Sequence, residues 1–125
     1  MSTDVRTYDV AARSTDVFGR VLCSTRDHHF IVDGPVQNGC PGEEVTPAEL
    51  FLASVGACAV ELIQVIGRQQ SVEVGSLHAR VHGMMDRSHP VRTDYMVFNQ
   101  VRVELDFKGT DYEKAFELAE AFKKR

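Results

Sequence analysis

The sequence predicts an α+β domain in which a mainly antiparallel sheet packs around one long buried helix. Three observations support this prediction. Residues 46–68 begin with helix-start signals and are largely apolar, several short segments alternate apolar and polar residues, and turn residues separate most of those segments. The expected order is β-β-β-α-β-β-α, and we expect residues 1–125 to form a single domain.

Three strands are expected before the long helix. Residues 5–12 and 18–24 are rich in β-forming residues and flank Ser14-Thr15-Asp16, which predicts a hairpin. Residues 28–33 make a third short strand that ends at Gly34-Pro35. Residues 34–45 contain three glycines and two prolines, so we expect a loop that leads into the helix.

The long helix has a well-marked start at Thr46. Thr46 is a good N-cap, Pro47 suits the first helical position, and Glu49 completes a capping box. From residue 50 to residue 60 the only polar side chains are Ser54 and Cys58, which predicts packing on more than one side. The apolar run ends at residue 61, short of the roughly 20 residues that a membrane span needs. Its small residues would let a second helix approach, including one from another subunit; they are Ala53, Ser54, Gly56, Ala57 and Ala59.

The second half of the chain predicts two strands and a helix. Residues 69–75 form a polar turn, residues 77–82 a half-buried strand, and residues 84–95 a proline-broken loop. Residues 101–108 alternate most clearly and predict a strand with one face in the core and the other in water. Thr110 and Glu113 form a second capping box, which predicts a final helix over residues 110–122.

Composition excludes several classes of function. A net charge of −4 without a cluster of basic residues, apart from the helix end at 123–125, argues against nucleic-acid or anionic-membrane partners. The N-terminus has no apolar signal segment, so we expect a cytoplasmic protein whose three cysteines are thiols. No phosphate loop, dinucleotide fingerprint or serine-hydrolase motif occurs, and we expect no cofactor. His78 and His82 lie in a predicted strand, roughly 13 Å apart, too far to share a metal ion.

Cys58 is the one candidate reactive group at a structural centre. Its spacing places it on the helical face of Phe51, Ser54, Val55, Glu61 and Leu62. From the residues alone two interpretations stay open: a reactive thiol, or a small buried hydrophobe, because free cysteine is among the most buried residue types.

Several segments together resemble one known family. Asp33-Gly34-Pro35, the loop with Gly39 and Gly42, Thr46 to Leu50, and Gly56-Ala57-Cys58 are similar to the osmotically inducible protein C / organic hydroperoxide resistance (OsmC/Ohr) family. The interval from Pro47 to Cys58 matches that family's interval between helix start and cysteine. The resemblance covers most of the chain. It implies an OsmC-like fold, an intertwined homodimer with a site at each interface, and a thiol-dependent peroxidase for organic hydroperoxides in oxidative-stress defence.

The resemblance also implies roles for individual residues. Cys58 would attack the peroxide as a thiolate, which needs a nearby cation because the helix dipole fades within the first turn. In the family this cation is an arginine of the first hairpin, so Arg20 and Arg13 are candidates, with Arg20 preferred because it follows Gly19 near the turn. Both could instead be solvated charges. The family's functional glutamate directly follows the proline, where this chain has Ala48; Glu49, one residue later, is either catalytic or only a cap.

The family's second, resolving cysteine follows the last helix, and this chain ends at Arg125 before that point. Three explanations stay open. A short member could resolve Cys58 through Cys40, Cys23 or an external thiol, with Cys40 preferred for its glycine-rich loop, or not be redox-active. The chain could be truncated, or a selenocysteine codon could have been read as a stop.

The alternative function is a catalytically idle OsmC-like protein that binds a small apolar ligand at the dimer interface. A purely structural dimer module is a third interpretation.

Overall fold

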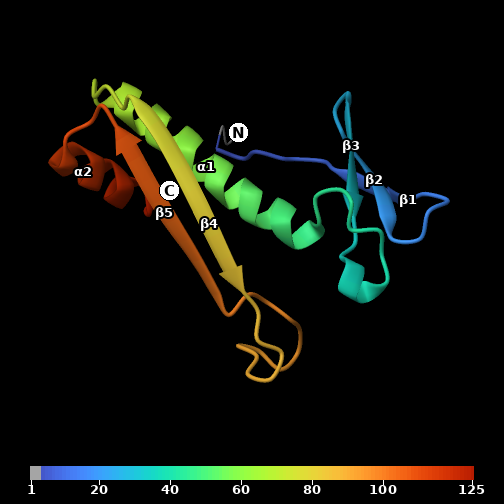
Figure 1. The fold of residues 1–125 in the computed structure, drawn as a ribbon. Coiled ribbons are helices and arrows are strands. Elements are labelled where there is room, and N and C mark those ends of the chain that lie inside the picture. Colours follow the sequence, from blue (N-terminus) through green and yellow to red (C-terminus); the bar gives the residue numbers. More distant parts are fainter. Residues whose placement is uncertain (1–3) are drawn as a thin grey trace. The chain divides into compact units, whose positions relative to one another are not determined.

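The computed structural model describes residues 4–125. It confirms the α+β class and the predicted order of elements (Figure 1). The elements are β1 (Ala11–Ser14), β2 (Arg20–Thr25), β3 (His28–Asp33), a short 3₁₀ helix η1 (Val36–Asn38), α1 (Pro47–Gln69), β4 (Ser76–Met84), β5 (Gln100–Lys108) and α2 (Tyr112–Phe122). The chain divides into two compact units, Met1–Leu50 and Phe51–Arg125, which we describe separately. The single-domain organisation stays a prediction.

The first unit is built on a three-stranded antiparallel sheet in the order β1-β2-β3. The register pairs Ala11 with Ser24 and Cys23 with Phe30. Cys23 and Val32 are buried. Because Val32 pairs with Val21, and residues two apart along a strand share a face, both buried side chains lie on the same face of the sheet.

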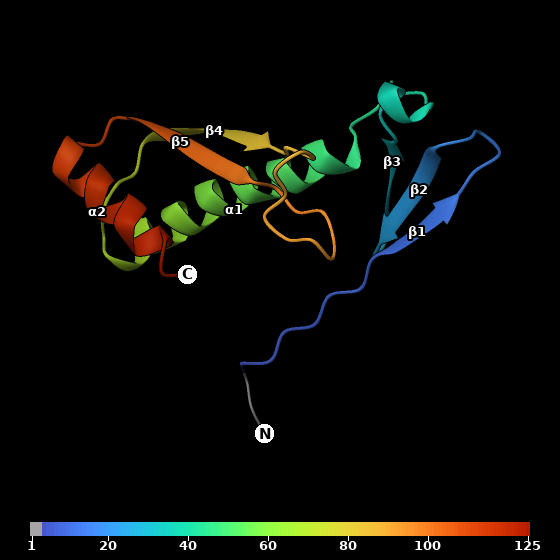
Figure 2. The ribbon, with the colours of Figure 1, turned by 90° about the horizontal axis from the view of Figure 1, so that it is seen from below.

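The first strand is much shorter than residues 5–12, and that prediction is wrong for residues 5–10. The pairing of Ala11 with Ser24 puts Val10 opposite Thr25, where β2 ends. The Thr25 hydroxyl donates to the carbonyl of Asp9 at 3.0 Å, and residues before Asp9 have no strand of this sheet opposite them. Figure 2 shows this segment continuing past the end of the sheet. A β-forming composition therefore produced no strand, because a strand also needs a partner.

The second unit has two layers. β4 and β5 are nine residues each and form a two-stranded antiparallel sheet, with α1 and α2 on one of its faces (Figure 2). The core between the layers contains Ile63 and Ile66 of α1, Val74, and Leu118 of α2. Leu77, Leu105 and Phe107 of the sheet pack against this cluster. The predicted core face of β5 is therefore confirmed at Leu105 and Phe107, whereas Val101, expected on the same face, is 39% exposed.

The burial predicted for α1 is wrong for a single chain. Only one face is buried, formed by Ala59, Ile63, Ile66 and Gly67. Phe51 is 50% exposed and Val65 36%. By length and composition α1 is long and apolar enough to cross a membrane, which the short apolar run did not predict. The core helix of a soluble protein can have the same length and composition. The apolar character of α1 thus exceeds what this chain buries.

At two positions the small residues of α1 admit sheet and turn side chains rather than a second helix. A Cβ added to Gly56 would lie 3.1 Å from Val81 of β4, and one added to Gly67 would lie 2.5 Å from Val74. Close approach was expected at Gly56 but not at Gly67, and at both positions the neighbour is a valine of the same unit.

The N-cap of α2 differs from the prediction. Asp111, not Thr110, caps the helix, because its carboxylate accepts from the backbone N–H of Lys114 at 2.9 Å. The Thr110 hydroxyl instead donates to the carbonyl of Val74. Thr110 therefore fastens the start of α2 to the turn after α1.

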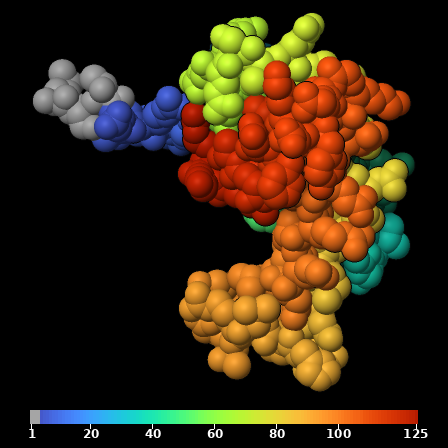
Figure 3. Space-filling model, turned by 90° about the vertical axis from the view of Figure 1, so that its left-hand side faces the viewer, coloured from blue at the N-terminus to red at the C-terminus, as the bar shows by residue number. Residues whose placement is uncertain are grey.

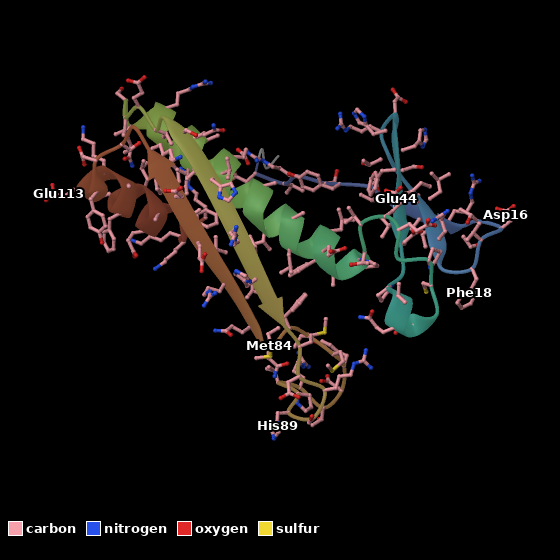
Figure 4. All side chains as sticks on the ribbon, viewed as in Figure 1. Asp16, Phe18, Glu44, Met84, His89 and Glu113 are labelled. Atoms are coloured by element: carbon pink, nitrogen blue, oxygen red, sulfur yellow. The ribbon has the colours of Figure 1, made fainter. Side chains whose placement is uncertain are left out.

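The loop between β4 and β5 stands out as a separate projection in Figure 3. Figure 4 places Met84 at its base and His89 at its tip. Asn99 closes it: its backbone N–H donates to the Met84 carbonyl at 2.8 Å, and its side-chain NH₂ donates to the His89 carbonyl at 2.7 Å. Hydrogen bonds from one residue to both positions give the loop a defined shape.

We expect Leu118→Ala to lower the free energy of unfolding by about 2–5 kcal/mol, because Leu118 is fully buried between α2 and α1 and its truncation leaves a cavity. Urea denaturation at a fixed protein concentration measures this change. Glu117→Ala is the control, since Glu117 is exposed on the same helix. Equal losses in both variants would contradict the assigned core.

Candidate functional site

Cys58 lies near the middle of α1 and is exposed. Phe51, Ser54 and Glu61 of the same helical face are exposed as well. The interpretation of Cys58 as a buried hydrophobe is therefore wrong for this chain by itself. Its thiol is open to a reactant.

The helical face of Cys58 begins at an aromatic pair. Phe51 stacks on Phe98, which lies just before β5, with ring centroids 5.5 Å apart. The Ser54 hydroxyl, one turn before Cys58, donates to the Phe51 carbonyl at 2.6 Å. The hydroxyl one turn before Cys58 is thus already hydrogen-bonded, and α1 has no basic residue between Pro47 and Gly67. A cation for a Cys58 thiolate must come from another element.

The preferred candidate for this cation, Arg20, opens β2 and pairs across the sheet with Asp33, the last residue of β3. Arg20 Nε donates to Asp33 Oδ1 at 2.8 Å, and Arg20 Nη2 donates to Asp33 Oδ2 at 2.9 Å. Two parallel N–H···O bonds of this kind fix both distance and orientation. Nη2 also donates to Glu43 Oε1 at 2.9 Å.

Asp33 is fully buried, and its carboxylate is satisfied by backbone groups as well as by Arg20. The N–H groups of Glu43 and Glu44 each donate to Asp33 Oδ2 at 3.0 Å. The hydrogen bonds from Arg20 hold the pKa of Asp33 well below its usual range, against burial, which acts in the opposite direction. The same bond to Asp33 raises the pKa of Arg20. We call Arg20, Asp33, Glu43 and Glu44 the Asp33 cluster.

Cys40, the preferred resolving thiol, packs beside this cluster. A Cβ added to Gly19 or Gly34 would lie 2.5 or 2.4 Å from Cys40 Sγ. These two glycines immediately precede Arg20 and follow Asp33, and the Gly34 N–H donates to the Gly19 carbonyl at 2.8 Å. The structure therefore brings Cys40 and Arg20 into one neighbourhood, and only glycine at both positions leaves room for the thiol.

Glu49 occupies the capping position. Its carboxylate accepts from the Thr46 N–H at 2.9 Å and from the Thr46 hydroxyl at 3.0 Å. The hydrogen bond from the Thr46 backbone N–H lowers the pKa of Glu49 most, and the bond from the Thr46 hydroxyl lowers it further. The predicted cap is confirmed. A catalytic role for Glu49 stays a prediction, and its carboxylate would have to serve both purposes.

Arg13, the second candidate cation, lies in β1 opposite Leu22. It is exposed, and within residues 4–125 its side chain has no hydrogen bond or ion pair. Arg13 and Arg20 share one sheet face, since Leu22 lies two residues after Arg20. Hydrogen bonds thus restrain the side chain of Arg20, whereas none restrains the side chain of Arg13.

Among residues 4–125 no three histidine, cysteine or carboxylate side chains gather as metal ligands would. His78 and His82 both lie in β4, as the alternation of this strand predicted.

Sequence reasoning missed Asp33 and Glu43, the two carboxylates that contact Arg20. Asp33 stands at the end of the apolar run Phe30-Ile31-Val32, and a charge in that position could have indicated a buried ion pair. Glu43 gave no such signal, because it is exposed and lies in a loop.

Comparison with protein families gives a match of residues 40–125 to the family described as OsmC-like protein. The matched segment contains both Cys40 and Cys58. Comparison with curated protein sequences gives no match.

Solved structures share the fold. An OsmC-like protein from Mycoplasma pneumoniae superposes with a TM-score of 0.80 at 14% identity, over 96% of this chain and 82% of that chain. An organic hydroperoxide resistance protein OsmC from Legionella pneumophila gives 0.74 at 18% identity, over 98% and 85%. The organic hydroperoxide resistance protein OhrB of Bacillus subtilis gives 0.62 at 25% identity, over 95% and 84%. The OsmC-like fold expected from the sequence is confirmed.

We expect the stabilisation that ionised Asp33 provides to disappear in acid. Because its folded-state pKa lies below the usual value of 3.8, this contribution is fully present above about pH 5 and is lost as the pH falls below 4 toward the folded-state pKa. The difference in unfolding free energy between wild type and Asp33→Asn should therefore shrink between pH 6 and pH 3 in urea denaturation. A difference that stays constant over this range would contradict an ionised, hydrogen-bonded Asp33.

Proposed function

The chain belongs to the OsmC-like protein family, and from this membership and the exposed thiol of Cys58 we propose that it is a thiol-dependent peroxidase that reduces organic hydroperoxides in oxidative-stress defence. The observation that carries the proposal is the position of Cys58: an exposed thiol at the middle of a long apolar helix. An apolar surface suits the organic part of a hydroperoxide. The names of the Legionella and Bacillus proteins, which refer to organic hydroperoxide resistance, support this substrate class.

The reaction requires the thiolate, because a thiol is a poor nucleophile. The Cys58 sulfur attacks one peroxide oxygen, the O–O bond breaks, and the second oxygen takes up a proton and leaves as the alcohol. Cys58 is then a sulfenic acid. A second thiol attacks its sulfur, a disulfide forms and water leaves. Two further thiol equivalents from an external reductant restore both cysteines.

The remaining residues take the following roles in the proposal. Arg20 supplies the positive charge beside the Cys58 thiolate, and Arg13 is the alternative on the same sheet face. Cys40 is the resolving thiol, with an external thiol as the alternative. Glu49 would contribute only if its carboxylate can leave the cap. A cytoplasmic location suits this chemistry, since the cytosol keeps thiols reduced.

We further propose that the exposed face of α1 packs against a second copy of the chain. Apolar surface contributes roughly 25 cal/mol per Å² when it leaves water, and a mostly apolar helix of 23 residues with only one buried face leaves much of that contribution unused. A homodimer would cover this face while leaving Cys58 in an apolar setting.

We expect brief treatment with an organic hydroperoxide in the presence of a sulfenic-acid trap to add the trap mass to the wild-type chain, and Cys58→Ser to abolish the addition. Peptide mapping by mass spectrometry locates the modification. Cys23→Ser is the matched control, because Cys23 is buried. If Cys58 stays unmodified while free cysteine is oxidised, the peroxidase is excluded, and binding of an apolar ligand becomes the better assignment.

The dimer is tested by Val65→Glu, which places a charge on the exposed face of α1. We expect wild type to sediment as a dimer at micromolar concentration and Val65→Glu to sediment as a monomer, because a buried unpaired charge is costly. Gln100→Glu adds the same charge at an exposed site on β5 and should stay dimeric. A monomeric wild type would contradict the proposal, and binding to phospholipid vesicles would assign the face to a membrane.

A further inference from the structure

We infer that Asp33 is a positioning residue for Arg20: it holds the guanidinium by the Nε–Nη2 edge and leaves Nη1 available to an anion. The inference rests on the proposed function, in which Arg20 stabilises the Cys58 thiolate. It adds Asp33 as the residue that orients the Arg20 guanidinium.

The hydrogen bonds of Arg20 define which edge is occupied. A guanidinium has five N–H groups in a fixed plane. The Nε–H and one Nη2–H go to Asp33, and the other Nη2–H goes to Glu43. Within residues 4–125 neither N–H of Nη1 has a hydrogen-bond partner. Because the group is rigid, holding one edge also sets the direction of Nη1.

Asp33 is suited to this role because its own position is fixed. It pairs with Arg20 across the β2–β3 ladder. Its N–H donates to the Val45 carbonyl at 3.1 Å, and its carboxylate receives the N–H groups of Glu43 and Glu44. It is fully buried. A short, buried side chain with backbone partners therefore restrains a long and flexible one.

Glu43 plays a different part, although it also contacts Arg20. Its side chain is 74% exposed, so water screens its charge and the ion pair contributes little. It nevertheless competes with any other anion for the guanidinium. The Glu43 side chain is thus not needed to orient Arg20.

Alanine stands directly after Pro47, and the carboxylates that contact Arg20 are Asp33 and Glu43. The chain supplies them from β3 and from the loop before α1.

The test is the apparent pKa of Cys58, obtained from the pH dependence of its alkylation rate and followed by mass spectrometry of its peptide. Simple electrostatics and positioning predict opposite results. If Asp33 acted only as a negative charge, Asp33→Asn would lower the pKa of Cys58. If Asp33 positions Arg20, Asp33→Asn should raise that pKa by about one pH unit, a tenfold change in thiolate population. Glu43→Gln should leave it unchanged or lower it.

Arg20→Ala separates this inference from the proposed function. We expect it to raise the pKa of Cys58 as much as Asp33→Asn, with no further rise in the double variant, because both act through one guanidinium. A rise in Arg20→Ala without a rise in Asp33→Asn would overturn the inference and leave the proposed function standing. No rise in Arg20→Ala would overturn both the inference and the choice of Arg20, and Arg13→Ala would then test the alternative cation.

A measurement on the unaltered protein covers the case in which Asp33→Asn does not fold. Held by Asp33, the Nε–H of Arg20 should exchange with water at least tenfold more slowly than that of Arg13 in ¹⁵N nuclear magnetic resonance spectra. Equal exchange rates for the two arginines would overturn the inference.

Discussion

The buried carboxylate of Asp33 is the interaction on which the first unit depends. A charge removed from water must be paired and hydrogen-bonded, or it costs several kcal/mol. Asp33 meets this requirement by gathering Arg20 from β2 and the N–H groups of Glu43 and Glu44 from the loop. Thr46, which begins the helical cap, follows two residues after Glu44.

The same cluster explains the glycines around Cys40. Gly19 precedes Arg20 and Gly34 follows Asp33, so the backbones next to the ion pair run close together, joined by a hydrogen bond of 2.8 Å. Cys40 fills the space that the missing side chains leave. Gly19 also has a φ of +81°, a conformation that a larger residue would adopt only with strain. A thiol, an ion pair and two glycines are therefore parts of one packing arrangement.

The second unit has a complementary constraint. α1 buries Ile63 and Ile66 against β4, β5 and α2, and leaves Phe51, Cys58 and Val65 exposed. A helix that is apolar on both sides is more apolar than one chain requires. The proposed homodimeric peroxidase rests on this excess as well as on the cysteine, because one surface would serve both the partner and an apolar substrate.

Local signals explain which features were predictable. Thr46 and Glu49 interact within one turn and Pro47 suits the first helical position, so the sequence by itself determined where α1 begins. The alternation along β5 likewise indicated its core face. Whether residues 5–10 form a strand, whether Thr110 or Asp111 caps α2, and which carboxylates hold Arg20 were decided only by the tertiary structure. Each of these depends on a partner distant in sequence: Thr25 for β1, Val74 for Thr110, and Asp33 for Arg20. Local propensity describes what a residue can do, and the available partner decides what it does.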